Sequence, residues 1–97
     1  MYTPDKEQQL EKVIEILKVL SNKARLGALC TMLEQEISVN ELSNMLDIQQ
    51  TALSQHLKIL RDMNLVEVRR DHRTLYYSTK DEKLLKLIVT LQELYCE

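Results

Sequence analysis

The 97-residue sequence has one glycine, one proline and no apolar run long enough to span a bilayer. The scarcity of glycine and proline argues against long flexible linkers and low-complexity segments, so we expect a single small domain over residues 1–97. The beginning of the sequence also lacks the pattern of a secretory signal peptide. These absences predict a cytoplasmic protein without a membrane partner.

Cysteine is also scarce, since only Cys30 and Cys96 are present. Two cysteines are too few for the disulfide framework of a secreted domain, and they do not form the Cys-x-x-Cys motif of a thioredoxin-like site. The sequence shows no Cys/His nucleophile pair, no phosphate-cradling loop and no paired carboxylates in a plausible cleft. An enzyme is therefore not expected.

The net charge of −2 hides an uneven distribution. Residues 50–80 carry a net charge of +3, whereas residues 1–49 carry −3 and residues 81–97 carry −2. A localised basic segment is typical of a surface that binds a polyanion, although a solvated mixed-charge surface has the same composition.

Apolar residues at helical spacing predict a helix over about 4–20, with Thr3 as its capping residue and Pro4 in its first turn. The apolar face of this helix is wide enough to form a subunit interface as well as a core. A second helix is expected after Ser21, its predicted cap. Its apolar stripe turns Cys30 inward and comprises Leu26, Leu29, Cys30, Leu33 and Ile37.

A helix-turn-helix is expected over about 38–63. Ser38 and Glu41 have the spacing of a capping box, which opens a short helix. A second helix follows from about Gln50 to Met63, with apolar residues on one face and amides, hydroxyls and bases on the other. Two short helices joined by a tight turn in this way are typical of a DNA-binding motif.

Two alternating segments rich in β-formers predict a hairpin, the wing, over about 65–79. A last helix is expected over about 81–96, with an apolar stripe that includes Leu84, Ile88 and Tyr95. The predicted order is α-α-α-α-β-β-α, a mainly α fold with a small β-hairpin, which is a winged helix-turn-helix.

Short polar side chains at the start of a recognition helix present donors and acceptors to base edges in the major groove. The residues predicted to do so, called the polar row below, are Gln50, Thr51, Ser54 and Gln55. Lys58 is better placed for phosphate, and His56 is expected either to contact phosphate or to pack against the wing. Arg69, Arg70 and Arg73 are expected to cluster at the wing tip and to contact flanking backbone or the minor groove.

The segments LSNKARLGALCTML and TALSQHLKILRDMNLVEVRRDHRTLYYS resemble the second helix, recognition helix and wing of the ArsR/SmtB family of bacterial winged-helix repressors. The resemblance covers essentially the whole chain. It implies a homodimer whose interface is formed largely by the first and last helices, and an inverted-repeat operator released by an effector. Asp47 and His72 stand where the family usually has glycine.

Metal sensing, common in this family, is not expected. Ser38 and Asn40 occupy the positions of the family's Cys-x-Cys metal site, and the last helix contains no histidine. Cys30 and Cys96 instead match two cysteines of the BigR, SqrR and HlyU branch. The resemblance to that branch implies a dithiol switch that reactive sulfur species crosslink, lowering DNA affinity. No cofactor is implied.

Two alternatives stay open. The chain could be a DNA-binding regulator whose cysteines are structural and which responds to another signal. Alternatively, it could be a winged-helix protein-interaction domain that no longer binds DNA.

Overall fold

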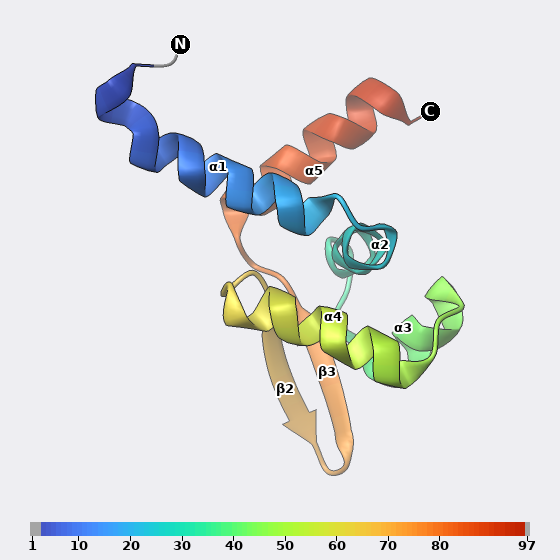
Figure 1. Cartoon of the computed structure of the whole chain (residues 1–97). Coiled ribbons are helices and arrows are strands. Elements are labelled where there is room, and N and C mark those ends of the chain that lie inside the picture. Colours follow the sequence, from blue (N-terminus) through green and yellow to red (C-terminus); the bar gives the residue numbers. More distant parts are fainter. Residues whose placement is uncertain (1–2, 97) are drawn as a thin grey trace.

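The computed structural model describes residues 3–96 of the chain. Its elements follow the order η1 (Pro4–Lys6), α1 (Glu7–Leu20), α2 (Lys23–Met32), β1 (Ile37–Ser38), α3 (Val39–Leu46), α4 (Gln50–Asp62), β2 (Glu67–Asp71), β3 (Thr74–Ser78) and α5 (Glu82–Tyr95). The predicted order of five helices and one hairpin is confirmed, and the fold is a winged helix-turn-helix (Figure 1).

The sheet has three strands rather than the predicted two, in the order β1-β3-β2, all antiparallel. Ile37 was predicted to continue the stripe of the second helix, which was wrong, because α2 ends at Met32 and Ile37 pairs with Tyr77 of β3. This short strand attaches the start of α3 to the base of the wing.

The helix caps agree with the sequence in part. The Oγ of Ser38 accepts the Glu41 backbone N–H and donates to the Glu41 carboxylate, so the predicted capping pair forms. The second helix is capped by the Asn22 side chain, not by Ser21 as predicted. Thr3 makes no side-chain cap bond, and the chain passes through the 3-10 turn η1 before α1 begins.

The core lies where α2, α3, α4 and the sheet meet and extends to α5. Its largest fully buried side chains are Leu29, Ile37, Leu42, Leu53, Leu57, Leu60 and Ile88. The single glycine serves the contact between two helices, because a Cβ at Gly27 would lie only 2.9 Å from Cδ2 of Leu46 in α3. Three of these buried side chains, Leu53, Leu57 and Leu60, come from α4, so the opposite face of α4 remains exposed.

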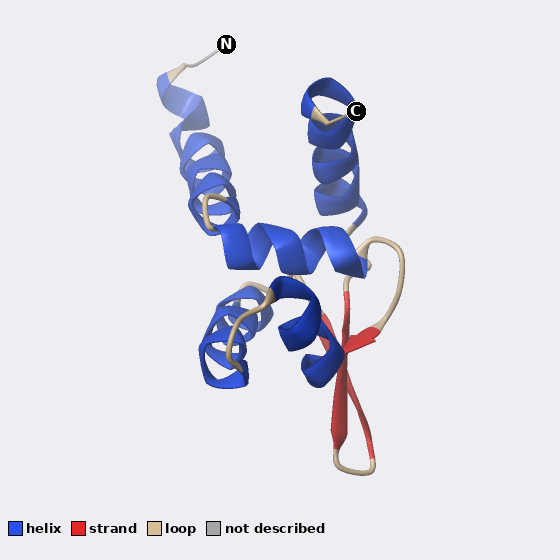
Figure 2. Ribbon diagram, turned by 90° about the vertical axis from the view of Figure 1, so that its right-hand side faces the viewer, coloured by secondary structure: helices blue, strands red, loops and turns tan. Residues whose placement is uncertain are grey.

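α1 and α5 lie on one side of α2, while α3, α4 and the sheet lie on the other (Figure 2). Both outlying helices leave apolar side chains in contact with solvent. On α1 these are Leu10, Val13, Ile14 and Leu17, and on α5 they are Val89, Leu91, Leu94 and Tyr95. A monomer gains nothing from exposing two such faces, so they mark a surface suited to a partner.

None of the described helices has the length and apolar character needed to span a bilayer.

Candidate nucleic-acid interface

The turn between α3 and α4 is built around Asp47, which has left-handed backbone angles, φ 53° and ψ 50°. Aspartate adopts this conformation more readily than most residues, so it can stand where glycine would be expected. The Ser43 hydroxyl donates to the carbonyl of Ile48 and holds the far side of the turn. Gln49 supplies no side-chain cap to α4, which agrees with its weakness as a capping residue.

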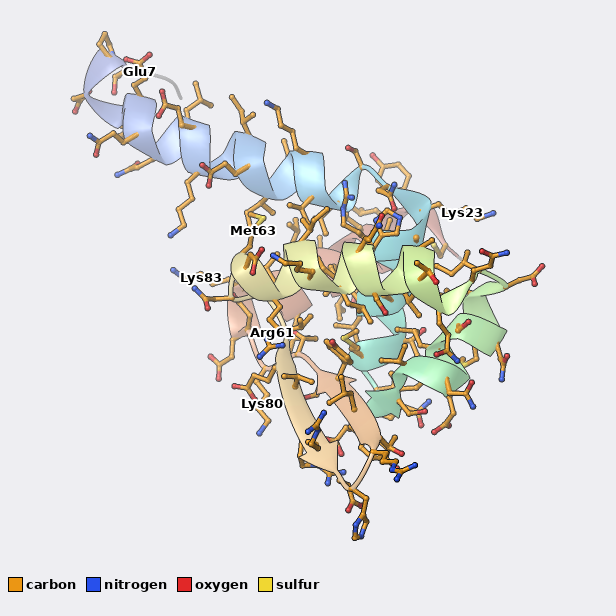
Figure 3. The ribbon with its side chains drawn as sticks, turned by 60° about the horizontal axis from the view of Figure 1, so that its bottom comes forward. Glu7, Lys23, Arg61, Met63, Lys80 and Lys83 are labelled. Carbon is orange, nitrogen blue, oxygen red and sulfur yellow. The ribbon has the colours of Figure 1, made fainter. Side chains whose placement is uncertain are left out.

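Side chains project from the outward face of α4, with Arg61 labelled near the C-terminal end of the helix (Figure 3). Leu53, Leu57 and Leu60 are fully buried, so the side chains on the opposite face are held toward solvent. All four members of the polar row are exposed: Gln50, Thr51, Ser54 and Gln55. This face offers several donors and acceptors within the first two turns of one helix.

Gln50 differs from the other members of the row because it is hydrogen-bonded within the protein. Its Nε2 donates to Oδ1 of Asn40 on α3 at 2.7 Å. Asn40 was not predicted as a site residue, and only its place in the first turn of the preceding helix could have drawn attention to it. The hydrogen bond with Asn40 fixes the Gln50 amide, and the carboxamide oxygen of Gln50 can still accept a further hydrogen bond.

His56 lies at the edge of the buried face of α4 and is half-buried. Its Nδ1 is 3.3 Å from Nη1 of Arg25 on α2. The prediction that His56 either contacts phosphate or packs against the wing missed this contact, because residues 31 positions apart in the chain leave no local sequence signal.

Two basic side chains of α4 are exposed to solvent near the C-terminal end of the helix. Lys58 pairs with Asp62 one turn later at 3.0 Å, and Arg61 is exposed. An exposed pair of this kind is weak and can give way to a phosphate. Lys58 therefore remains suited to the phosphate contact predicted for it.

The wing carries its three arginines at different heights. Arg73 follows His72 in the tip, and Arg70 lies one residue from the end of β2. Arg69 was predicted to share the tip, which was wrong. It lies in the middle of β2 with its guanidinium 4.7 Å from the centroid of the Tyr76 ring, and it pairs with Glu36. Because side chains alternate along a strand, Arg69 and Arg70 leave opposite faces.

His72 gives the wing tip its turn. Its φ of 58° lies in the left-handed region, and its side chain is 95% exposed, with Nε2 3.6 Å from Oδ1 of Asp71. The position thus adopts the backbone that glycine usually supplies there, and the imidazole extends away from the protein at the end of the hairpin.

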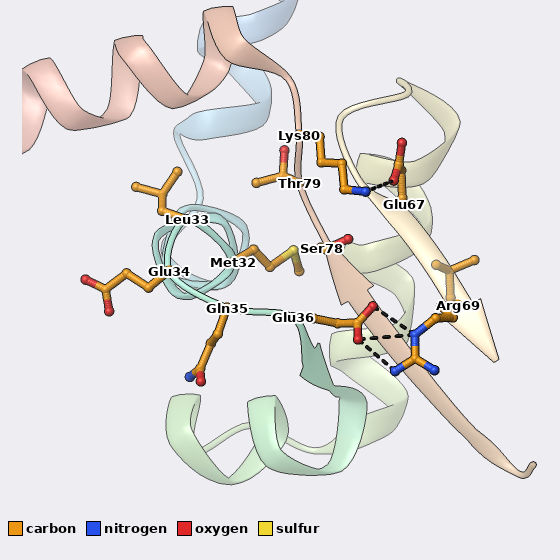
Figure 4. Close-up of a pocket in the computed structure, with 11 residues that line it drawn as sticks. Met32, Leu33, Glu34, Gln35, Glu36, Glu67, Arg69, Ser78, Thr79 and Lys80 are labelled. Carbon is orange, nitrogen blue, oxygen red and sulfur yellow. Dashed lines mark hydrogen bonds and ion pairs between the residues drawn. The ribbon is translucent and has the colours of Figure 1, made fainter. Parts of the chain in front are cut away.

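An open pocket of about 510 Å³ lies between the end of α2 and the base of the wing (Figure 4). Two ion pairs frame it: Arg69 with Glu36 at 2.7 Å, and Lys80 with Glu67 at 3.8 Å. The hydrogen bond from Arg69 lowers the pKa of Glu36 and, reciprocally, raises that of Arg69. The pocket mixes both signs of charge and is wide open to solvent.

The two cysteines lie on the helix α2 and just after the helix α5. Both are free thiols, with Cys30 partly buried in α2 and Cys96 exposed after α5. Burial raises the pKa of the Cys30 thiol, and the negative charge of a Cys96 thiolate raises it further, while hydrogen bonding from the Gln92 amide lowers it. Cys30 was predicted to point inward, and it packs against the core while keeping a partly exposed surface.

Among residues 3–96, no group of three or more His, Cys, Asp and Glu side chains is arranged to hold a metal ion.

Comparison with known proteins connects this geometry to a family. Residues 22–68, which span α2 to the start of the wing, match the model of bacterial regulatory proteins of the arsR family. The transcriptional activator HlyU of Vibrio cholerae is 38% identical over 97 residues, covering 100% of this chain and 90% of HlyU. The chain belongs to the ArsR family. This ArsR-family chain is therefore a transcriptional regulator and not an enzyme.

Solved structures of the family superpose closely on this ArsR-family regulator. Reduced HlyU from Vibrio cholerae has a TM-score of 0.91 at 38% identity, covering 98% of this chain and 100% of HlyU. The transcriptional repressor BigR from Xylella fastidiosa has a TM-score of 0.88 at 36% identity, covering 100% and 99%. A homodimeric winged helix-turn-helix DNA-binding domain from Mycobacterium bovis has a TM-score of 0.81 at 27% identity, covering 96% and 86%.

Proposed function

We propose that the protein is a homodimeric repressor in the bacterial cytoplasm that binds an inverted-repeat operator and leaves it when Cys30 and Cys96 become crosslinked. The observation that carries the DNA-binding part is the exposed polar row of α4, held toward solvent by three buried leucines. Direct base readout needs side chains of this kind on a helix that enters the major groove.

The dimer is supported by the exposed apolar faces of α1 and α5. Leu17 is 55% exposed and Leu94 69% exposed, which is unusual for leucines unless a partner covers them. The Mycobacterium bovis neighbour is described as homodimeric. In a two-fold dimer each α4 reads one half-site, so the spacing between the two helices selects an inverted repeat.

In this proposal the polar row contacts the edges of the DNA bases, and the basic side chains around the row contact phosphate. Lys58 and the wing arginines Arg70 and Arg73 supply exposed positive charge on either side of the row. Arg69 joins them only when it exchanges the Glu36 carboxylate for a phosphate. Such contacts provide affinity that falls as salt rises.

The proposed signal is a reactive sulfur species such as a persulfide. The support is that the negative charge of a Cys96 thiolate raises the pKa of the Cys30 thiol, so the two thiols lie within electrostatic range of each other. The exposed Cys96 thiolate attacks the outer sulfur of a persulfide, RSSH, and becomes a persulfide itself as RSH leaves. The Cys30 thiolate then attacks the inner sulfur, closing a disulfide and expelling HS⁻.

A longer bridge forms when both thiols are first converted to persulfides. One persulfide then attacks the inner sulfur of the other, giving a trisulfide and expelling HS⁻. The extra sulfur relaxes the distance that a plain disulfide demands. Either crosslink joins α5 to α2 covalently, and so changes the position of α4 relative to the proposed dimer faces.

The test begins with selection of a duplex from a random library by the reduced wild-type protein. The expected product is an inverted repeat, and glutathione persulfide should release it while removing both free thiols, with one sulfur gained where the bridge is a trisulfide and none where it is a disulfide. Cys30→Ser and Cys96→Ser variants should bind the same duplex and stay bound. Release of both variants would leave DNA binding in place and remove the cysteines as the signal. Failure to select any duplex would favour a protein-interaction domain.

A further inference from the structure

The side chain of Arg25 joins the end of α1 to the proposed recognition helix. Its Nε donates to the carbonyl of Val19 at 2.7 Å, and its Nη2 donates to the carbonyl of Lys18 at 3.3 Å. Its Nη1 contacts Nδ1 of His56 on α4 at 3.3 Å. The last carbonyls of a helix carry partial negative charge and lack partners within the helix, so a guanidinium is well suited to this position.

The contact determines where the proton of the His56 ring lies. A guanidinium has only donors, so Nδ1 of His56 must accept. In a neutral imidazole the other nitrogen then carries the hydrogen. Nε2 of His56 is therefore an N–H donor.

That donor is open to solvent. Within residues 3–96, Nε2 of His56 has no hydrogen-bond partner, and no buried side-chain nitrogen or oxygen lacks one. Nε2 therefore reaches the surface of α4, beside the polar row. A solvent-facing N–H at the margin of a recognition helix can meet the sugar-phosphate backbone.

We propose that Arg25 is a positioning residue for DNA binding, which orients the His56 ring so that its Nε2–H donates to a phosphate of bound DNA. The proposal rests on the proposed function, because it requires α4 to be the recognition helix. It adds a defined donor atom and names the residue that holds it.

The same bonds make the position of His56 depend on α1. Because Nε and Nη2 of Arg25 are held by the last turn of α1, a displacement of α1 moves the guanidinium and the ring that it contacts. α1 carries one of the two exposed apolar faces proposed for the dimer. Arg25 thus provides a direct path from the subunit interface to a phosphate contact.

Two substitutions of His56 distinguish the roles of its two ring nitrogens. Asparagine keeps an acceptor near the position of Nδ1 but has no donor at Nε2, whereas glutamine keeps a donor near Nε2 and loses the Nδ1 acceptor. We expect His56→Asn to weaken binding of the library-selected duplex about tenfold, the usual effect of losing a hydrogen bond to a charged group. His56→Gln should bind at least several-fold more tightly than His56→Asn.

Ring ¹⁵N NMR on the wild-type protein tests the tautomer directly. The neutral His56 ring should show Nε2 protonated and Nδ1 bare, and Arg25→Met should convert it to a mixture of tautomers. Arg25→Met should also lose affinity, but less than His56→Asn because a fraction of its rings keeps the hydrogen on Nε2, while Arg25→Lys, which can still donate, should recover part of the loss. If Arg25→Met does not fold, the proposal is tested by the affinities of His56→Asn and His56→Gln and by the tautomer of the wild-type ring.

The outcomes separate this proposal from the proposed function. If the wild-type protein selects a duplex and His56→Asn binds it as tightly as the wild type, the phosphate contact is wrong. A wild-type ring protonated at Nδ1 would overturn the role of Arg25. If no duplex is selected at all, the failure lies with α4 as a recognition helix, and the tautomer result alone remains valid.

Discussion

Arg69 binds Glu36 through three hydrogen bonds, linking the wing to the segment between α2 and β1. Nε of Arg69 donates to both carboxylate oxygens at 3.2 and 3.1 Å, and Nη2 donates to Oε1 at 2.7 Å. The guanidinium also stacks on Tyr76 of the neighbouring strand. Two non-bridging oxygens of a phosphate can accept the guanidinium fork as a carboxylate does, so in the proposed DNA complex a phosphate would compete with Glu36 for Arg69.

Substitution of Glu36 by glutamine should raise DNA affinity. The change releases Arg69 from its partner and removes a negative charge from the wing, so we expect about a two- to fivefold gain at low salt. The gain should shrink at high salt because screening weakens the added phosphate contact. Binding of the selected duplex measured at several salt concentrations provides the test.

Glu34→Gln is the matched control for this experiment. Glu34 lines the same pocket and is also exposed, so its substitution changes the net charge equally without freeing Arg69. Equal gains in the two variants would mean that net charge alone is responsible. No gain in Glu36→Gln would mean that Arg69 does not reach DNA.

The Arg69–Glu36 pair also has a defined pH dependence. The hydrogen bond from Arg69 holds the pKa of Glu36 below its usual value of 4.5. Since the folded-state pKa is the lower one, the contribution of the pair to stability is complete above the unfolded-state value and is lost as pH falls through the folded one. In Arg69→Gln, the NMR titration midpoint of the Glu36 carboxyl carbon should move upward.

Arg70→Gln provides the comparison, because Arg70 lies next to Arg69 in β2 and leaves the opposite face of the strand. Its removal should leave the Glu36 midpoint in place. An unchanged midpoint in Arg69→Gln would show that the ion pair does not persist in solution.

The helices, the hairpin and the exposed polar row could be predicted because each rests on local information. The leucines of α4 recur at helical spacing, and Ser38 and Glu41 sit three residues apart, so both patterns lie within one short window. The choice between Ser21 and Asn22 as a cap could not be made in this way, since both residue types cap helices well.

The features that sequence reasoning missed are contacts between distant segments. β1 contains only Ile37 and Ser38, too short to show alternation, and it is a strand only because Tyr76 and Tyr77 pair with it. Arg25 and His56, and likewise Arg69 and Glu36, meet after the chain has folded. Spacing rules contain no information about such pairs, and these pairs determine which polar groups remain free for DNA.

Substitution of Leu17 by glutamate should produce a monomer. Leu17 is 55% exposed on the apolar face of α1, and a buried carboxylate without a partner would oppose association. Affinity for a duplex with two half-sites should fall on the order of a hundredfold, because the second half-site no longer adds to the first. Sedimentation and binding measurements on the same sample connect the two effects.

Met45→Glu is the matched control, since Met45 is 61% exposed but lies on α3, away from α1 and α5. It should sediment with the mass of the wild type. A dimer that survives in Leu17→Glu would exclude this face of α1 from the interface.

The reactivity of the thiols should follow their surroundings. Burial and the charge of Cys96 raise the pKa of Cys30 above its usual value of 9.0. At neutral pH Cys30 is therefore mostly protonated and should be alkylated after the exposed Cys96, and its rate should still be rising at pH 9. Timed alkylation followed by peptide mass mapping gives both rates and the order.

Gln92 is the residue through which this order can be changed. Its amide lowers the pKa of Cys30, so Gln92→Leu should raise that pKa and slow both alkylation and persulfide crosslinking of Cys30. Glu93→Gln, an exposed neighbour on α5, should react at the wild-type rate. Because crosslinking needs the Cys30 thiolate as its second nucleophile, Gln92→Leu should accumulate the Cys96 persulfide. Slower alkylation with unchanged crosslinking would instead mean that closure of the bridge does not depend on Cys30 ionisation.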